Sequence, residues 1–301
     1  MSLVGNLKIG TMSPLNLYKT FKGVLFLLSL AFGLLLFNLH CFVIFLLVRP
    51  WSLRYYRHLI RLGAAAWSNH SAWCFEQGQG VELVITGDTI SDPEENALLI
   101  PNHQAMVDIL LVFAFARRYN RAGHLKWFAK EAIKYIPIFG WALACTDSIY
   151  MKRSWQKDKN KVEQMFSRFH QEDIPLWLAI FPEGTRRTLR KQEISILFSQ
   201  RQGVKPTSKV MYPRTKGFVA TVGALRGHLK AVYNITFRYQ DHPPSLTGLL
   251  SGSVDKIHLH VQRFDISSVP EDEKAMKQWL IERFLEKESY LNFATHSKED
   301  S

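Results

Sequence analysis

The sequence predicts an α/β protein with a mixed, largely parallel sheet flanked by helices, and an N-terminal membrane-embedded helix or helical hairpin. Two observations support this prediction. From about residue 80 onward, short apolar runs alternate with amphipathic stretches, a pattern typical of strands connected by helices. Near the N-terminus, residues 23–48 contain no charged side chain and form a run long enough to enter a membrane.

The uncharged stretch of residues 23–48 is expected to attach the protein to a membrane. About 25 helical residues reach about 37 Å, enough to cross the hydrocarbon core with some tilt. Two arrangements stay open: a single span, or a hairpin that dips into one leaflet and turns near Gly33 or Asn38. Basic residues flank both ends and are more numerous downstream, so the domain that follows is expected on the cytoplasmic side. We expect a bacterial inner membrane in preference to the endoplasmic reticulum.

The chain divides into an N-terminal membrane anchor with an interfacial segment, residues 1–75, and an α/β domain, residues 76–301. Apolar runs predict strands at 81–86, 96–100, 124–130, 148–153, 175–181, 231–239 and 256–264. Amphipathic stretches predict helices after Gln104 and at 156–171, 189–201, 216–226 and 269–288, the last with Pro270 in its first turn.

The composition is that of a folded protein. Of its 301 residues 47% are hydrophobic, and eight are tryptophans, which excludes a disordered chain. Its three cysteines, Cys41, Cys74 and Cys145, are an odd number without CxxC spacing. This argues against a disulfide framework and against a thiolate zinc site, and it fits a reducing compartment.

Basic residues concentrate in the middle of the chain. Residues 101–250 hold 24 Lys and Arg against 10 Asp and Glu, whereas the whole chain has a net charge of +12. Such a field attracts an anionic partner: nucleic acid, an acidic membrane surface or a phosphorylated substrate. Because the uncharged stretch of residues 23–48 contradicts a soluble nucleic-acid binder, we expect no nucleic-acid partner.

Asn102, His103 and Asp108 come directly after the predicted strand at 96–100, at the carboxyl end where α/β folds gather their active sites. The imidazole and the carboxylate can meet only if His103 lies in the loop or helix cap and Asp108 reaches back from the second helical turn. A carboxylate bound to one ring nitrogen leaves the other free as a base. No serine or cysteine nucleophile accompanies them, which favours a base acting on a substrate hydroxyl. A buried polar pair or, with a further ligand, a metal site would use the same residues.

The sequence FPEGTRRT, residues 181–188, follows the most apolar predicted strand. Gly184 permits a sharp turn, and Arg186 and Arg187 offer forked donors that match phosphate oxygens. We expect Glu183 to brace the loop or to pair with an arginine rather than to react. Taken alone, the segment also fits a plain turn between a strand and a helix.

Together these motifs resemble those of the glycerophospholipid acyltransferases, in particular the 1-acylglycerol-3-phosphate acyltransferase family. NHxxxxD at 102–108 is followed by FPEGTR at 181–186. YMKRSWQKDK at 150–159 resembles the family's second block, and MYPRTKGFVATVGALRG at 211–227 resembles its fourth, with wording close to the lysocardiolipin acyltransferase-like branch. The resemblance covers about residues 80–240 and contains four blocks in order.

The resemblance implies an O-acyltransferase. His103 would be the general base that deprotonates the acceptor hydroxyl, and Asp108 would orient it and stabilise its charge. Pro213 would correspond to a proline near the acyl site. The acceptor's phosphate pocket would be formed by Glu183, Gly184, Thr185 and Arg186, with Lys152 or Arg153.

The resemblance also implies the substrates. The donor would be a fatty-acyl thioester on coenzyme A or acyl carrier protein, used as a co-substrate, with no bound cofactor or metal. The acceptor would be lysophosphatidate, giving phosphatidate in phospholipid biosynthesis, and the basic middle of the chain suits both phosphate substrates and membrane lipids. Other interpretations stay open: a different lysophospholipid such as lysocardiolipin, a metal-dependent membrane hydrolase with His103 and Asp108 as ligands, or a catalytically silent lipid-binding protein.

Overall fold

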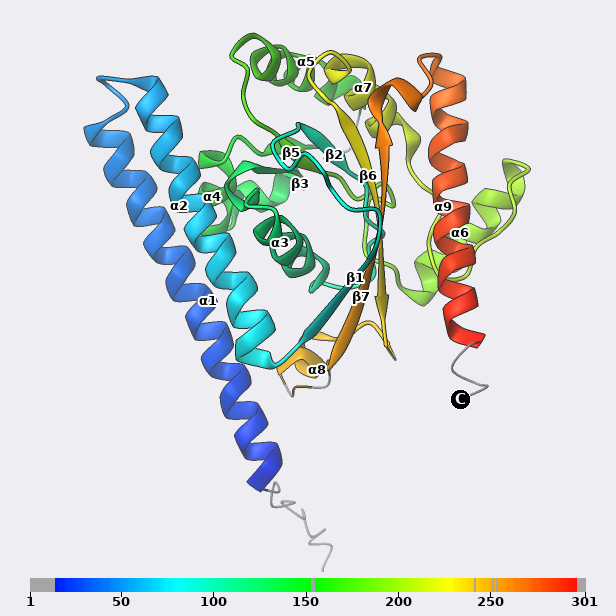
Figure 1. Cartoon of the computed structure of the whole chain (residues 1–301), viewed down its shortest axis with the longest axis horizontal. Coiled ribbons are helices and arrows are strands. Elements are labelled where there is room, and N and C mark those ends of the chain that lie inside the picture. Colours follow the sequence, from blue (N-terminus) through cyan, green and yellow to red (C-terminus); the bar gives the residue numbers. More distant parts are fainter. Residues whose placement is uncertain (1–13, 153–154, 241, 251, 253, 297–301) are drawn as a thin grey trace, which may run out of the picture.

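The computed structural model describes residues 14–152, 155–240, 242–250, 252 and 254–296. A seven-stranded sheet, in the order β1-β7-β6-β2-β5-β3-β4, forms the centre of the molecule. Helices cover both faces of this sheet, and two long helices at the start of the chain lie along one side (Figure 1). Strands β6 and β7 are antiparallel, whereas the other described neighbours are parallel. This confirms the predicted mixed, largely parallel sheet.

All seven predicted strands are present, each within two residues of its predicted bounds. They are β1 (Glu82–Gly87), β2 (Ala97–Leu99), β3 (Leu125–Lys130), β4 (Ile149–Met151), β5 (Trp177–Ala179), β6 (Ala231–Tyr239) and β7 (Lys256–Asp265). Every residue of β2 and β5 is buried. Strands covered on both faces need apolar side chains at every position, which is why these runs were recognisable in the sequence.

The two faces of the sheet belong to separate hydrophobic cores. Ala97 and Leu99 pack into the core of α3 (Asp108–Arg118), and Leu98 between them packs into the opposite one. The opposite core is covered by α5 (Trp155–Gln171), α7 (Thr215–Leu225) and α9 (Glu273–His296). The sheet therefore lies between two helical layers, as Figure 1 shows.

The remaining helices include both predicted and unpredicted ones. The predicted helix at 189–201 is α6 (Leu189–Arg201), whereas α4 (Phe139–Cys145) and α8 (Leu246–Leu250) were not predicted. The placement of Pro270 inside the last helix was wrong. Helix α9 begins at Glu273, because Asp272 accepts a hydrogen bond from the Ala275 N–H at 2.8 Å and so caps the helix.

The N-terminal apolar segment is one unbroken helix, α1 (Pro14–Leu47), which the short turn at 48–52 joins to α2 (Leu53–Trp73). A turn at Gly33 or Asn38 was therefore a wrong prediction. Gly33 serves helix packing, since a Cβ there would come within 3.0 Å of the His70 ring on α2. Asn38 donates its amide to the Leu34 carbonyl at 2.8 Å, inside the helix. By length and composition, Leu17–Leu47 could cross a membrane.

Candidate active site

Two loops meet at the carboxyl edge of the sheet, because β2 and β5 are parallel neighbours and Leu99 pairs with Ala179. The loop after β2 carries residues 100–107, and the loop after β5 carries residues 180–188. Both predicted motifs therefore emerge side by side, although about 75 residues of sequence separate them. Parallel α/β sheets place ligands at this edge.

His103 and Asp108 are in direct contact, with 2.8 Å between His103 Nδ1 and Asp108 Oδ2. Asp108 is the first residue of α3, rather than a residue of its second turn as predicted. The helix dipole favours a carboxylate at that position. The aspartate is fully buried, whereas the imidazole side chain keeps 15% of its surface exposed. The carboxylate thus holds Nδ1 and leaves Nε2 as the ring nitrogen for a substrate.

Further contacts fix the orientation of this pair. Asp108 Oδ2 also accepts the backbone N–H groups of Gln104 and Ala105, at 2.6 and 2.9 Å, and the Tyr239 hydroxyl donates to Oδ1. The Phe181 ring stacks on the imidazole, with 4.1 Å between the ring centroids. Both the direction and the plane of the His103 ring are therefore set by the protein before any substrate binds.

Asn102 connects the same loop to the sheet. Its side chain accepts from the Phe237 N–H at 2.7 Å and donates to the Phe237 carbonyl at 3.1 Å. The amide is completely buried, and this pair of bonds satisfies the backbone of β6 where the loop crosses it. Asn102 positions the loop and does not face a substrate.

Glu183 binds the two motifs together. Its Oε1 accepts the His103 backbone N–H at 2.6 Å, and its Oε2 accepts the Met211 N–H at 3.1 Å. Burial raises the pKa of Glu183 to about 8, an effect that these two N–H bonds and the nearby Lys287 ammonium oppose. A second link runs between the backbones, from the Arg187 N–H to the His103 carbonyl at 2.9 Å. Glu183 thus braces both loops.

Gly184 adopts a positive φ of +69°, and a Cβ there would come within 2.9 Å of the Arg214 side chain. The Arg214 N–H donates to the Pro182 carbonyl at 2.7 Å, and its exposed side chain crosses the loop at the glycine. Arg214 was not among the predicted site residues. The one signal in the sequence was its position directly after Pro213 in the block at 211–227. A second guanidinium therefore lies over the arginine-bearing loop.

The other residues predicted for the phosphate pocket do not all lie on the loop at 181–188. The Thr185 hydroxyl accepts from Lys191 Nζ at 2.6 Å, and the Arg186 side chain is exposed to solvent. Lys152 follows β4, two strands away from β5, and its Nζ lies 3.8 Å from Glu131 Oε1. Arg153 lies outside the described residues. Pro213 is buried beside Arg214, two positions after the residue that binds Glu183.

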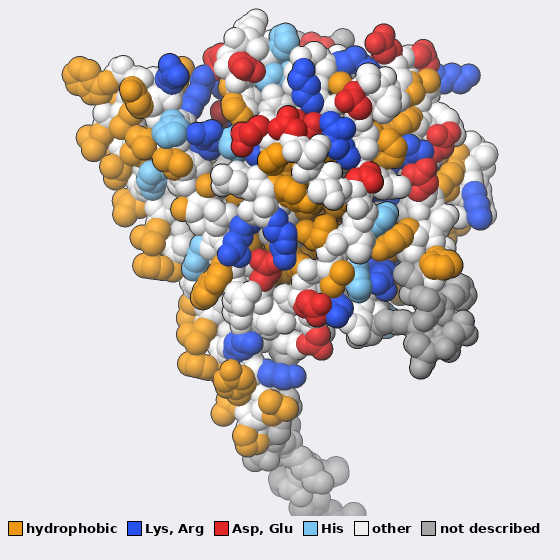
Figure 2. Space-filling model, in the orientation of Figure 1, with side chains coloured by type: hydrophobic (Ala, Val, Ile, Leu, Met, Phe, Trp, Pro, Cys, Tyr) orange, Lys and Arg blue, Asp and Glu red, His pale blue; other side chains and the backbone are white. Residues whose placement is uncertain are grey.

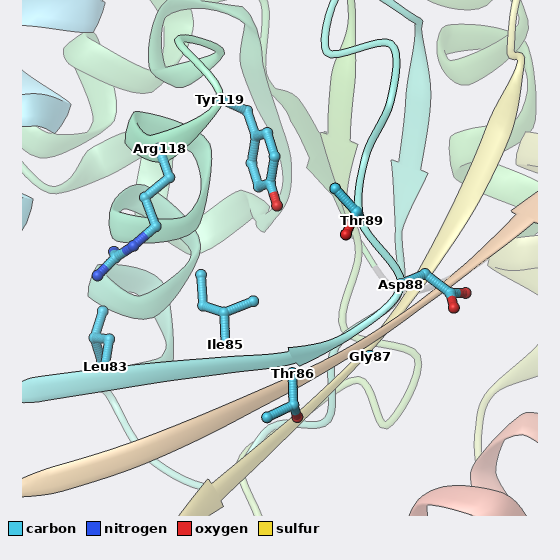
Figure 3. A pocket seen from close by; sticks show the side chains of 8 residues that line it. All are labelled: Leu83, Ile85, Thr86, Gly87, Asp88, Thr89, Arg118 and Tyr119. Carbon is cyan, nitrogen blue, oxygen red and sulfur yellow. The ribbon is translucent and has the colours of Figure 1, made fainter.

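A cavity of about 400 Å³ opens elsewhere, between the end of β1 and the last turn of α3. Figure 3 shows Arg118 and Tyr119 on one side of it and Thr86, Asp88 and Thr89 on the other. Because α3 begins at Asp108 and its eleven residues span about 16 Å, this cavity lies at the far end of the helix from His103. None of the predicted site residues lines it.

The carboxyl edge carries the His103 imidazole and two buried carboxylates, of which Asp108 holds the imidazole ring and Glu183 holds the backbone. Within the described ranges, no three His, Cys, Asp or Glu side chains come together as a metal site. What the arrangement offers is a proton acceptor at Nε2, a buried carboxylate that stabilises the protonated ring, and guanidinium groups beside it for an anion.

Comparisons with known proteins agree with one another. A family model described as "Acyltransferase" matches residues 82–233, and one described as "Acyltransferase C-terminus" matches residues 248–298. The chain is 32% identical to the probable 1-acyl-sn-glycerol-3-phosphate acyltransferase 5 of Arabidopsis thaliana, over 92% of this chain and 74% of that protein. It is 33% identical to lysocardiolipin acyltransferase 1 of Gallus gallus, over 90% of this chain and 73% of that protein.

Among solved structures, the chain is similar to the 1-acyl-sn-glycerophosphate acyltransferase PlsC from Thermotoga maritima. The TM-score is 0.55 over 90% of this chain and 95% of that chain, with 15% sequence identity. At that identity the likeness establishes a common fold, including the mixed sheet and the flanking helices.

Proposed function

The chain belongs to the acyltransferase family and is an O-acyltransferase, and from this premise we propose that it transfers a fatty-acyl group from an acyl thioester to the free hydroxyl of lysophosphatidate. The observation that carries the proposal is the buried contact between His103 and Asp108 beside an arginine-bearing loop. A base without a protein nucleophile suits direct attack of a lipid hydroxyl on a reactive carbonyl. The product would be phosphatidate.

The proposed mechanism is a single acyl transfer. His103 Nε2 takes the proton of the acceptor hydroxyl while the hydroxyl oxygen attacks the thioester carbonyl carbon. The tetrahedral intermediate then collapses, so that a C–O ester bond replaces the C–S bond, and the protonated imidazole returns the proton to the leaving thiolate. Asp108 stabilises the imidazolium between these two steps. The stacked Phe181 ring keeps Nε2 aimed at the acceptor.

The loop at 181–188 would hold the phosphate of the acceptor. Arg186 and Arg214 carry forked donors that can bind phosphate oxygens in pairs. The positive φ of Gly184 lets the loop backbone approach an anion closely. Glu183 acts indirectly, since its two oxygens already accept N–H groups. Lys152 and Thr185 would complete the pocket, with Arg153 as a further candidate.

A second acceptor class deserves the same assay. Identity to the lysocardiolipin acyltransferase of Gallus gallus is as high as identity to the plant 1-acyl-sn-glycerol-3-phosphate acyltransferase. An acceptor with a larger phosphate-containing headgroup would use the same base and the same arginines. Comparing lysophosphatidate with lysocardiolipin under identical conditions distinguishes the two.

We propose that residues 1–75 attach the α/β domain of residues 76–301 to the cytoplasmic face of a membrane. Hydrophobic side chains form a row over α1 along one side of the molecule (Figure 2). On its inner side α1 packs against the protein along most of its length: a Cβ on Gly23 would overlap the Leu250 carbonyl of α8, and Gly63 of α2 receives the His40 ring. A helix with one protein-covered side and one apolar side favours lying in one leaflet.

The experiment that tests the function measures coenzyme A release from an acyl-CoA by purified protein in vesicles, with and without lysophosphatidate. We expect release that depends on the acceptor and falls by at least about 100-fold in His103→Ala. The matched control is His58→Ala, which removes an exposed imidazole from α2 and should leave the rate unchanged. A fully active His103→Ala would contradict the mechanism.

A further inference from the structure

The connection between β3 and β4 exposes large apolar side chains. Tyr135, Ile136 and Trp141 are 74%, 51% and 60% exposed. They belong to one segment, residues 131–145, which we call the apolar turn. This segment contains the 3-10 helix Glu131–Tyr135 and α4. Single exposed apolar residues are common on soluble proteins, whereas a close group of them marks a contact surface.

The backbone of the apolar turn is strained and tightly held. Ile138 has φ +68° and ψ −54°, and the Phe139 N–H donates to the Pro137 carbonyl at 2.7 Å. This is a γ-turn with a β-branched residue at its centre, one of the least favourable places for such a side chain. A Cβ on Gly140 would come within 2.4 Å of the Lys134 carbonyl oxygen. Strain of this kind persists only where the neighbouring structure enforces it, and it commonly marks a functional segment.

Hydrogen bonds and packing from the neighbouring structure hold the apolar turn in this strained conformation. The Tyr150 hydroxyl of β4 donates to the Gly140 carbonyl, and the Gly140 N–H donates to the Ile136 carbonyl at 2.9 Å. On the inner side of the turn, Ala142 is buried with Phe37 and Cys41 of α1. The exposed side chains are therefore presented outward from a fixed base that is continuous with the apolar helix α1.

The apolar turn also borders the candidate active site. It begins directly after Lys130, where β3 ends at the carboxyl edge of the sheet beside β5. Trp127 of β3 stacks against Phe181, with 6.4 Å between centroids, and Phe181 stacks on His103. Glu131, the first residue of the apolar turn, pairs with Lys152. The segment thus connects the catalytic edge to the surface of α1.

We propose that the apolar turn inserts into the bilayer as a second membrane contact and brings lipid substrates from the bilayer to His103. The inference rests on the proposed function, because it deepens the membrane attachment assigned to α1. The occupant is a lipid surface: tyrosine and tryptophan are the side chains preferred at the bilayer interface. Lys134, directly before Tyr135, is also exposed, and its charge can meet lipid phosphates while its stem lies along apolar surface. The turn would therefore set how lipid reaches the site, and α1 would hold the protein on the membrane.

The test compares one variant on two acceptors. The variant combines Tyr135→Ser, Ile136→Ser and Trp141→Ser. Its acyl transfer is measured to two acceptors: long-chain lysophosphatidate in phosphatidylcholine–phosphatidylglycerol vesicles, and a short-chain lysophosphatidate dissolved as monomers. Losing three inserted side chains is expected to lower kcat/KM on vesicles by at least about tenfold and to leave the soluble acceptor unaffected. The matched control replaces three exposed apolar residues of α6, Leu189, Ile194 and Leu197, by serine and should change neither rate.

Two results would overturn the proposal: unchanged activity on vesicles, or an equal loss on both acceptors. Thermal unfolding in detergent shows whether the variant is folded. Insertion is measured without activity as the quenching of tryptophan emission by brominated phosphatidylcholine, in wild type and in Trp141→Phe. A quenched component that disappears in the variant supports insertion, and identical quenching in both proteins refutes it. A wild type that is quenched but transfers no acyl group would refute the proposed function alone.

Discussion

At the scale of single residues, the candidate site depends on how completely Asp108 is hydrogen-bonded. Its two oxygens receive His103 Nδ1, the N–H groups of Gln104 and Ala105, and the Tyr239 hydroxyl. A buried carboxylate without such donors would be costly to ionise. Burial, together with the carboxylate and the hydrogen bond to it, raises the pKa of Tyr239 well above its ordinary value, so its hydroxyl stays a donor.

We predict that Tyr239→Phe lowers kcat by about tenfold and leaves both KM values nearly unchanged. The variant removes one donor from Asp108 and would loosen the support of the imidazolium, which in the proposed mechanism forms only during the reaction. Steady-state kinetics with both substrates checks this.

The chain offers a matched control in Tyr233→Phe. Tyr233 is also buried and donates to a carboxylate, that of Glu95, in a cluster with Arg263. Removing its hydroxyl should lower the unfolding temperature without lowering kcat. An equal loss of kcat in both variants would mean that a buried tyrosine hydroxyl acts here only through stability.

Sequence reasoning located His103 and Asp108 because they lie five positions apart in one motif next to a recognisable buried strand. It missed Tyr239 and Arg214 for a physical reason. Tyr239 lies 131 positions after Asp108 and reaches it through the pairing of β6 with β2, which no local pattern encodes. Arg214 meets Gly184 only because its backbone binds the Pro182 carbonyl across the loop.

At the scale of elements, the loop at 181–188 contains Gly184 with a positive φ, and the side chain of Arg214 crosses the loop at this glycine. Gly184 needs its positive φ for the turn, and the absence of a side chain makes room for Arg214. Glu183 holds the same loop to His103 from the other side. Glu183 and the Arg214 contact thus fix the position of this loop relative to His103.

We predict that Gly184→Ala destabilises the protein by about 1 kcal/mol and raises the KM for lysophosphatidate by about tenfold. The new methyl group would displace the Arg214 guanidinium and weaken phosphate binding, while the KM for the acyl donor stays the same. Gly203→Ala is the matched control. Gly203 has φ +67° at the end of α6, and no atom lies within 4 Å of an added Cβ, so this variant should lose stability only. A similar KM in both variants would argue against a role for Arg214 in binding.

The strands of the sheet were predictable for different reasons. Strands β2 and β5 were found because a strand with two covered faces is a short continuous apolar run, whereas β7 shows the alternation of buried and half-buried positions that is typical of a strand with one covered face. The apolar turn was not predicted as helical, because its helices are short and expose apolar residues, which conceals the amphipathic pattern. The start of α9 was placed too early because Pro270 is a plausible first-turn residue, and the side-chain cap by Asp272 decides otherwise.

At the scale of the whole molecule, composition indicated a membrane segment but could not show how it lies. An apolar run has the same sequence whether lipid surrounds it or protein covers one side. In the structure α1 packs along α2, and α2 in turn packs on α3, where Trp67 meets Phe113 at 5.3 Å between ring centroids. Gly33 and Gly63 allow close approach between α1 and α2, and Gly23 lets α1 approach Leu250 of α8. If α1 keeps these contacts in a membrane, it would lie in one leaflet, because a span would draw α2 and the domain into the bilayer.

We therefore predict that tags fused to the two ends of the chain lie on the same side of the membrane. In sealed vesicles of one orientation, a protease added outside should cleave both tags or neither, and detergent should expose both. A high-salt wash should not release the protein, because apolar contacts rather than charge would hold α1 in the leaflet. Cleavage of only one tag before detergent is added would instead require α1 to span the bilayer and separate from α2, contrary to the packing of Gly33 against His70.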